Sequence, residues 1–342
     1  MLSVMPRNIF WKTGLKTNDN HMNDKQTAAQ TRAGFAAIIG APNAGKSTLV
    51  NALVGEKISI VTHKIQTTRF QVRGIAMHDN TQIVLVDTPG IFEPRQRLDR
   101  SMVHAAWSGV ADADVIVHVV DAPSYSKVHR SAEPSGQDKK SAQDTDRVIT
   151  GLVKRSNSRP VFLALNKIDE MEKEHLLELI KLFEKTEAYS DIFMISALKG
   201  NGVPELITKL AENMPIGPFL YPTEQAADIP LRLMAAEITR EKLFVRLHNE
   251  LPYASHVETE KWTNMKNGDI KIEQVIYVRR KSQKPIVLGK GGQTIKQIGQ
   301  MARHDMRESF GKKVHLFLFV KVRENWSEDR SKYLESGLEF DV

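Results

Sequence analysis

The chain of 342 residues has no cysteine, which excludes disulfide bonds and cysteine-ligated zinc or iron–sulfur centres. Its histidines are not spaced as metal ligands. It also lacks internal repeats, low-complexity tracts and any apolar run near the roughly 20 residues of a transmembrane helix. What remains is a globular composition, 41% hydrophobic and 26% charged, in a chain long enough for two domains.

The first 32 residues lack the apolar core of a secretory signal. Asp19 and Asp24 interrupt the positive charge that a mitochondrial transit peptide would need. We therefore expect residues 1–31 to be a disordered extension, with Met22 as an alternative start of translation.

Positive charge is concentrated toward the C-terminal end. The whole chain carries +7, whereas residues 271–320 alone hold eleven Lys and Arg against three acidic residues, a net +8. The remainder of the chain therefore balances near neutrality. A local basic region predicts a polyanionic partner such as nucleic acid, although many basic proteins bind none.

Apolar runs that stop at a polar residue or a glycine indicate buried strands at 35–39, 82–86, 115–120, 160–165 and 192–195. Periodic apolar positions indicate helices at 47–54, 174–185 and 204–213. Strands separated by helices predict an α/β fold, with a mostly parallel sheet covered by helices on both faces.

Two segments interrupt or end this pattern. Residues 123–146 are polar throughout and are predicted to be a mobile surface insertion. Residues 215–230 are rich in proline and glycine and are predicted to be a linker. The first domain is accordingly expected at 32–214, the second at 231–326 and a C-terminal tail at 327–342.

The second domain has a different order of elements, helix–strand–strand–helix–strand, which predicts an α+β fold. The helices are expected at 231–249 and 293–310, and the strands at 253–262, 270–280 and 314–322. Residues 284–288 are interpreted as a short extended run.

Residues 40–47 read GAPNAGKS, which matches the phosphate-binding pattern G-x-x-x-x-G-K-[ST] between a strand and a helix. Its glycines let backbone N–H groups converge on phosphates, and the helix N-terminus favours negative charge. Lys46 can reach the β- and γ-phosphates, and Ser47 Oγ can ligate Mg²⁺. The motif predicts a P-loop nucleotide site.

Asp87-Thr88-Pro89-Gly90 follows the next buried strand. Asp87 can hold Mg²⁺ through water, and the Gly90 N–H can contact the γ-phosphate. Between this motif and the P-loop, residues 65–69 read IQTTR. A threonine here is expected to complete the Mg²⁺ shell, and we favour Thr68 over Thr67.

Asn166-Lys167-Ile168-Asp169 ends a third strand, and Ser196-Ala197 ends a fourth. The Asp169 carboxylate can accept two hydrogen bonds from guanine, a donor pair that adenine lacks. Asn166 can contact the base N7 and orient the loop, while Lys167 can cover the ring. These motifs predict GTP rather than ATP, because an unpaired carboxylate penalises the wrong base.

The predicted reaction is in-line attack of water on the γ-phosphorus of GTP. The residue after Gly90 is Ile91, where Ras-like GTPases carry a water-orienting glutamine, so intrinsic turnover should be slow. Asn43 either holds a monovalent cation such as K⁺ against the phosphates or stabilises the loop.

The predicted site residues form four groups. The catalytic group is Lys46, Thr68, Gly90 and Asn43, and the Mg²⁺ ligands are Ser47, Thr68 and Asp87. The GTP-binding group is Gly40, Ala41, Pro42, Asn43, Ala44, Gly45, Lys46, Ser47, Thr48, Asp87, Thr88, Pro89, Gly90, Ile91, Asn166, Lys167, Ile168, Asp169, Ser196 and Ala197. The RNA-binding group is Gly289, Lys290, Gly291, Gly292, Arg279, Arg280, Lys281, Lys284 and Lys296.

The RNA-binding group surrounds a G-x-x-G sequence at 289–292 that precedes a helix. In KH domains such a loop clamps a single-stranded backbone, and the flanking cations add a salt-dependent attraction. Alone, G-x-x-G is also an ordinary helix-opening turn.

The P-loop, QTTR, DTPG and NKID motifs in this order resemble the Era family of bacterial GTPases, as do residues 234–243, 250–253 and 287–296 of the second domain. The resemblance covers about 34–326. It implies a P-loop GTPase domain followed by a type II KH domain that binds the 3′ region of 16S ribosomal RNA and assists maturation of the 30S subunit. It also implies a cytoplasmic protein, a monomer, with peripheral association with the inner membrane.

The sequence leaves three other functions open. A constitutive RNA-binding assembly factor would use nucleotide only for structure, and its RNA affinity would be equal with GDP and with a GTP analogue. A P-loop kinase or ATPase would need an acceptor site that the sequence does not show. A membrane-anchored role is the weakest, because no lipidation motif is present.

Overall fold

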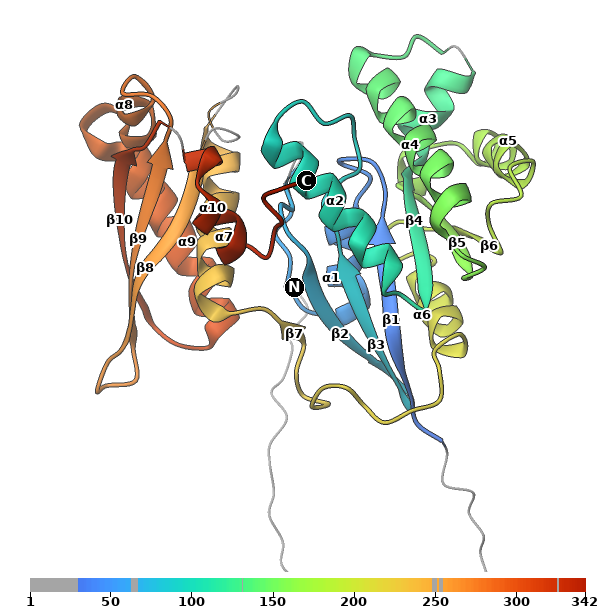
Figure 1. Ribbon diagram of the computed structural model, residues 1–342, viewed down its shortest axis with the longest axis horizontal. Coiled ribbons are helices and arrows are strands. Elements are labelled where there is room, and N and C mark those ends of the chain that lie inside the picture. Colours follow the sequence, from blue (N-terminus) through green and yellow to red (C-terminus); the bar gives the residue numbers. More distant parts are fainter. Residues whose placement is uncertain (1–29, 63–66, 131, 248–250, 252–254, 325) are drawn as a thin grey trace, which may run out of the picture.

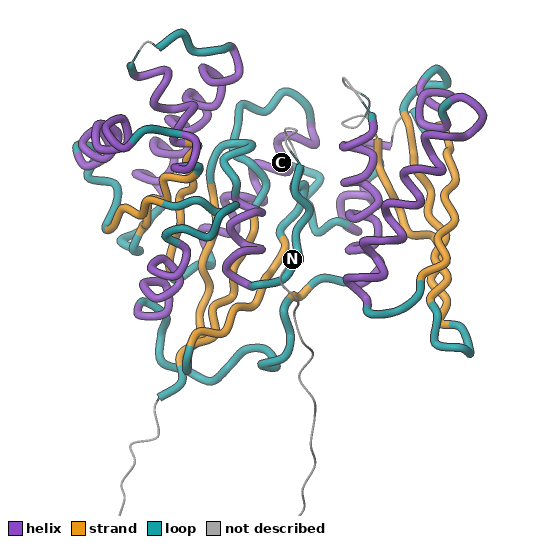
Figure 2. The backbone as a smooth tube through the Cα atoms, turned by 180° about the vertical axis from the view of Figure 1, so that it is seen from behind, coloured by secondary structure: helices purple, strands orange, loops and turns teal. Residues whose placement is uncertain are grey.

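The structure is a computed structural model that describes residues 30–62, 67–130, 132–247, 251, 255–324 and 326–342. These residues form two sheets, one of seven strands and one of three, each packed against its own helices (Figure 1). The two units lie side by side, and Figure 2 shows the same arrangement from behind. The predicted fold class, an α/β unit followed by an α+β unit, is confirmed.

The seven-stranded sheet has the order β6-β5-β4-β1-β3-β2-β7. Its strands are β1 (Arg32–Ile39), β2 (Val72–His78), β3 (Thr81–Asp87), β4 (Val115–Asp121), β5 (Val161–Asn166), β6 (Asp191–Met194) and β7 (Ala227–Asp228). Strands β6, β5, β4, β1 and β3 are parallel, and β2 and β7 continue the sheet in antiparallel pairs. The carboxyl ends of the parallel strands share one edge, so the P-loop, DTPG and NKID motifs meet there.

Helices cover both faces of this sheet. They are α1 (Lys46–Val54), α2 (Arg97–Ala111), α3 (Ala122–His129), α4 (Gly136–Arg155), α5 (Lys173–Glu184) and α6 (Val203–Glu212). Strand β1 shows how alternate residues serve the two faces. Ala36 and Ile38 pack with residues of α1 and α6, while Ala37 and Ile39 pack with residues of α2 and α4.

The prediction of a mobile insertion at 123–146 is wrong, because this stretch contains α3 and the first half of α4. Ser135 begins α4 with a capping box, its side chain accepting from the Asp138 N–H. Ala142, Val148 and Leu152 form a narrow buried stripe along an otherwise polar helix. The polar composition concealed this stripe.

The second unit comprises α7 (Leu231–Arg246), β8 (Ser255–Asn264), β9 (Ile270–Val278), α8 (Gln283–Leu288), a short 3₁₀ turn (Lys290–Gly292), α9 (Gln293–Phe310) and β10 (Val314–Val322). The strand order is β10-β9-β8, with β9 and β10 parallel. Leu243 of α7, Ile298 of α9 and Ile276 of β9 share one core. Figures 1 and 2 show α7 facing the first unit.

The extended run expected at 284–288 is instead helix α8. Pro285 lies in its first turn, where a missing N–H costs nothing and the fixed φ suits a helix.

The C-terminal segment returns to the first unit through a 3₁₀ turn (Trp326–Glu328) and α10 (Arg330–Glu335). Tyr333 and Leu338 are buried in the same apolar cluster as Leu98 and Met102 of α2. The C-terminus accordingly lies beside α2 (Figure 1). Every described helix is too short or too polar to span a bilayer.

Candidate nucleotide site and nucleic-acid interface

Residues 40–47 form a tight loop between β1 and α1. Gly40 and Gly45 have φ of 153° and 98°, values that favour glycine. A Cβ on Gly40 would lie 2.3 Å from the Val119 carbonyl oxygen, and one on Gly45 would lie 2.2 Å from Asn166 Nδ2. Both positions therefore require glycine for space as well as for conformation.

A cavity of about 290 Å³ opens over this loop. It is lined by Pro42, Asn43, Lys46, Thr48 and Gly90 among others. Lys46 Nζ donates to the carbonyls of residues 40 and 41 at 3.2 and 2.9 Å. Burial lowers the pKa of Lys46 to about 8, an effect that the nearby Asp87 carboxylate opposes.

Ser47 and Thr68, which line the cavity, both contact Asp87 behind it. Ser47 Oγ donates to Asp87 Oδ2 at 2.7 Å and lies 2.8 Å from Thr68 Oγ1. Asp87 is fully buried, its Oδ1 has no hydrogen-bond partner, and burial raises the pKa of its carboxyl group. Thr67 Oγ1 instead lies 2.7 Å from Thr62 Oγ1. A buried carboxylate with a free oxygen beside two hydroxyls is a donor set that fits Mg²⁺.

Asn166 joins the P-loop to the turn after β6. Its Nδ2 donates to the Ala44 carbonyl at 2.8 Å, and its Oδ1 accepts from the Ala197 N–H at 2.9 Å. This is the loop-orienting role that the sequence predicted for Asn166. Asp169 is exposed and lines the same cavity together with Ser196.

Four other predicted residues, Thr88, Pro89, Ile91 and Ile168, are buried or form contacts within the fold. Thr88 Oγ1 donates to the Ile38 carbonyl at 2.7 Å, which fixes the end of β3 against β1. Ile91 is buried, and its N–H donates to the Gly40 carbonyl at 3.1 Å. Pro89 is buried and Ile168 begins a 3₁₀ turn, its N–H donating to the Ile195 carbonyl.

Several residues that line the cavity were not predicted, among them Asp121 and Gln137. Asp121 ends β4, pairs with Lys167 Nζ and caps α3 by accepting from the Ser124 N–H. Its place at the end of an apolar strand was the available signal. Gln137 reaches the cavity from the first turn of α4, and the misread segment gave no signal for it.

The G-x-x-G turn joins α8 to α9. Gly289, Gly291 and Gly292 all have positive φ, at 74°, 58° and 76°. A Cβ on Gly289 would lie 2.1 Å from Thr294 Oγ1, whereas one on Gly291 or Gly292 would meet no heavy atom within 4 Å. The turn is therefore packed at its first glycine and open at its last two.

The flanking cations fall into two groups. The first group is exposed and forms no ion pair with any described residue. It consists of Arg280, Lys281, Lys284, Lys290 and Lys296. Arg279 differs, because its guanidinium lies over the Trp326 ring at 5.5 Å and Nη2 donates to Gln96 Oε1 at 3.4 Å. Arg279 is thus at the junction between the two units.

A groove of about 270 Å³ runs between α9 and β10, next to the cation Lys296. Ile295, Gly299, Leu316 and Leu318 form its apolar wall, and Arg303 adds a second cation. The sequence analysis did not predict this groove. The apolar alternation along β10 indicated one buried face but not a gap beside the helix.

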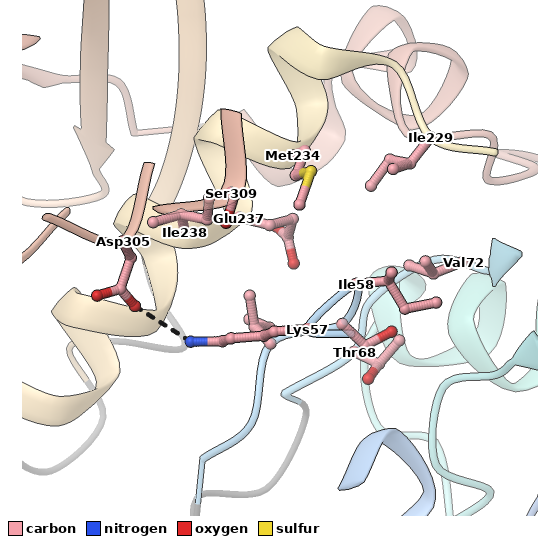
Figure 3. Close-up of a pocket in the computed structure, with 12 residues that line it drawn as sticks. Lys57, Ile58, Thr68, Val72, Ile229, Met234, Glu237, Ile238, Asp305 and Ser309 are labelled. Atoms are coloured by element: carbon pink, nitrogen blue, oxygen red, sulfur yellow. Dashed lines mark hydrogen bonds and ion pairs between the residues drawn. The ribbon is translucent and has the colours of Figure 1, made fainter. Parts of the chain in front are cut away.

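The loop that carries Thr68 also contacts α7. The Val61 N–H donates to Glu241 Oε1 at 3.0 Å, and Arg240 Nη2 donates to the Thr67 carbonyl. Thr68 lines the nucleotide cavity and also a cavity of about 20 Å³ between the units. Figure 3 shows Thr68 across that cavity from Glu237, while Lys57 reaches Asp305 of α9.

Comparison with known proteins covers both units. Residues 35–167 match the family described as 50S ribosome-binding GTPase, and residues 250–327 match the KH domain family. GTPase Era of Caulobacter vibrioides is 56% identical over 316 residues, 92% of this chain and 99% of the relative. GTPase Era of Sinorhizobium medicae is 53% identical over 324 residues, 95% of this chain and 99% of the relative.

Two solved structures are similar over the whole fold. One is Era in complex with MgGDPNP and nucleotides 1506–1542 of 16S ribosomal RNA, with 34% identity and a TM-score of 0.79. The other is a tyrosine-to-alanine variant of Aquifex aeolicus Era bound to GDP·AlF₄⁻, with 33% identity and a TM-score of 0.78. Each alignment covers 91% of this chain and 100% of the other. With both units matched in order and at this identity, the chain is a member of the GTPase Era family, a GTPase with a P-loop domain followed by a KH domain.

Proposed function

We propose that this GTPase is a nucleotide-controlled switch that binds the 3′ region of 16S ribosomal RNA and assists assembly of the small ribosomal subunit. The RNA-bound Era structure, 34% identical to this chain, supports the choice of RNA. The observation that carries the switch is the position of Thr68, which lines both the nucleotide cavity and the cavity between the domains. In this proposal the GTPase domain comprises residues 32–214 and the KH domain residues 231–326.

In the proposed GTP site, Lys46 and the backbone N–H groups of residues 43–48 bind the phosphates. Ser47 and Thr68 would ligate Mg²⁺ directly and Asp87 through water, and the bound ion neutralises charge on the phosphate oxygens. The Gly90 N–H would contact the γ-phosphate. These groups stabilise charge that develops when water attacks the γ-phosphorus.

The base is proposed to lie between the NKID loop and the turn after β6. Asp169 would accept from the guanine N1–H and amine, and Ala197 and Ser196 would face the base O6. Lys167, held by Asp121, would cover the ring. Ile91 is buried and apolar, so it cannot orient the attacking water, and slow intrinsic turnover follows.

RNA is proposed to bind at the G-x-x-G turn and the adjoining groove. The open Gly291 and Gly292 allow close approach of the RNA backbone, and Lys290 and the exposed cations nearby attract its phosphates. The apolar wall between α9 and β10 can take unstacked bases. Arg279 would act in this group only if the domain junction opened, because it now lies against Trp326.

Equilibrium binding to the 3′-terminal segment of 16S ribosomal RNA, at one fixed salt concentration, tests the proposal. Affinity is expected to differ between GDP and a non-hydrolysable GTP analogue, and to be lost in Gly291→Asp. Gly268→Asp is the matched control, because Gly268 also has positive φ and open space but lies in the β8–β9 turn.

Tight RNA binding that is equal with both nucleotides would overturn the switch and support a constitutive assembly factor. Binding that survives Gly291→Asp would overturn the proposed surface.

Three finer properties complete the proposal. Asn43, which has φ of 63° and lines the nucleotide cavity, would hold K⁺ against the phosphates, and equal turnover in K⁺ and Na⁺ would contradict this. The resemblance to Era proteins supports a cytoplasmic monomer with peripheral contact with the inner membrane. Light scattering and sedimentation with lipid vesicles test these two points.

A further inference from the structure

Trp326 lies at the junction of the two domains, four residues after β10 ends at Val322. Its side chain is 3% exposed. The guanidinium groups of Arg69 and Arg279 lie over its ring, 5.6 and 5.5 Å from the centroid. The His256 ring stacks on it at 5.3 Å with an interplanar angle of 21°. A single buried indole thus contacts cations from both domains.

Arg69 connects this indole to the nucleotide site, because it is the residue after Thr68. Its side chain is buried, and Nη1 donates to the Ser255 carbonyl at 3.0 Å. Burial, and then the neighbouring Arg240 cation, lower the pKa of Arg69 to about 9, which leaves it charged at neutral pH. The Thr68 loop is therefore held to the KH domain through a charged, desolvated side chain.

Arg279 connects the same indole to α2. Its Nη2 donates to Gln96, the N-cap of that helix, which follows Gly90 in the chain. Of the two cations on Trp326, Arg69 is therefore next to Thr68 in the chain, and Arg279 contacts the N-terminus of α2.

The chain after Trp326 fixes the indole against α2. Arg97 Nε pairs with Glu328 at 3.1 Å, and the Arg97 guanidinium lies 4.3 Å from the centroid of Phe340. Tyr333 packs in the cluster that contains Leu98. The ring of Trp326 therefore cannot shift without disturbing contacts on α2.

We propose that Trp326 is a positioning residue for GTP hydrolysis: it binds the Arg69 and Arg279 cations and so holds the Thr68 loop and the start of α2 in one arrangement with the KH domain. An electron-rich indole face offsets the repulsion between two guanidinium groups and replaces the water they lose on burial. This inference rests on the proposed function, because it takes Thr68 to be a Mg²⁺ ligand.

The test compares Trp326→Leu with Trp326→Phe in the full chain. Leucine keeps apolar volume but removes the aromatic face, whereas phenylalanine retains one that is weaker than indole. Affinity for a GTP analogue with Mg²⁺ should fall about fivefold to tenfold in Trp326→Leu and about twofold in Trp326→Phe. Affinity for GDP should stay near that of the native chain in both, because Thr68 is needed only with the γ-phosphate.

Hydrolysis gives a second measurement. In Trp326→Leu, kcat should fall together with analogue affinity. Trp262→Leu is the matched control, because Trp262 packs on Phe310 within the KH domain, and it should leave both nucleotide affinities unchanged. The proposal would be overturned if analogue affinity fell equally in the Leu and Phe variants, or if the affinities for GDP and for the analogue fell equally. Either result would show that Trp326 only fills space.

Thr68→Ala distinguishes the role of Thr68 as a Mg²⁺ ligand from the positioning role of Trp326. If Thr68→Ala lowers the affinity for the GTP analogue and Trp326→Leu does not, the positioning role of Trp326 fails and the proposed GTP site stands. If Thr68→Ala changes nothing, the proposed Mg²⁺ ligand fails and the positioning role fails with it.

Discussion

The nucleotide cavity and the G-x-x-G surface are built in opposite ways. At the nucleotide site, Lys46, Asp87 and Asn166 are buried and each forms hydrogen bonds with neighbouring residues. On the KH surface, Lys290 and Lys296 are exposed and form no ion pair with described residues. One site is a closed polar network, and the other is a set of independent cations beside an apolar groove.

This difference sets how each site should respond to change. A buried network is desolvated, so removing one member leaves others unpaired and the loss is large. Exposed cations are screened by salt and act almost independently, so each loss is small and depends on ionic strength. Substitutions in the cavity should therefore cost more binding than substitutions on the KH surface.

Lys46→Ala should have the largest effect. It removes the buried cation of the P-loop, and GTP affinity should fall by about 10²- to 10³-fold in a calorimetric titration. Lys181→Ala, an exposed lysine of α5, is the control and should bind GTP as the native chain does. If GTP affinity fell less than tenfold in Lys46→Ala, the buried site would be no more sensitive to substitution than an exposed surface.

Gly289→Ala should weaken RNA binding about tenfold or more, because the new Cβ meets Thr294 and the residue keeps a positive φ. Gly291→Ala has the backbone strain without the steric contact, so its loss should be smaller, about threefold. Both are measured by RNA titration, and GTP affinity should stay constant. Equal losses would mean that packing at Gly289 does not shape the turn.

The pH dependence of GTP binding should reveal the buried Lys46. Its pKa of about 8 lies below the ordinary lysine value, and bound phosphates would raise it. Affinity is therefore full below pH 8 and falls as the pH rises, about tenfold between pH 7 and pH 9. Guanosine has no phosphates and reports the titration of the base itself. A GTP curve no steeper than the guanosine curve would contradict this role of Lys46.

Lys290→Ala should have the smallest effect. RNA affinity should fall only a few-fold, and the slope of log affinity against log salt should decrease by about 0.7. The native chain and Lys181→Ala, titrated over the same salt series, are the references. A large loss that salt does not modify would place Lys290 in a closed network rather than among independent cations.

Much of the nucleotide site could be predicted from the sequence because its geometry is local. Gly40 and Gly45 indicate the loop, and the helix α1 that follows it begins at Lys46. Asp87 and Asn166 were predicted from their positions at strand ends, and parallel strands place such residues at one edge. The choice of Thr68 over Thr67 agrees with the geometry around Ser47.

The secondary structure of two segments was predicted wrongly, because their residue composition did not reveal how they pack. The polar segment at 123–146 is helical because each of its helices buries one narrow face while the rest of the helix faces solvent. The run at 284–288 looked extended because it is short and apolar, a pattern that does not distinguish strand from helix.

The nucleotide chemistry, the two fold classes and the basic second domain could be predicted from the sequence, because these depend on residue types at fixed local spacings. Helix α2 and strand β2 were not predicted. Tertiary structure alone decided that Arg279 contacts Trp326, that Thr68 lies between two cavities and that the C-terminal segment packs on α2. Such contacts join residues far apart in the chain, and their formation depends on how whole domains pack. No local pattern encodes that packing.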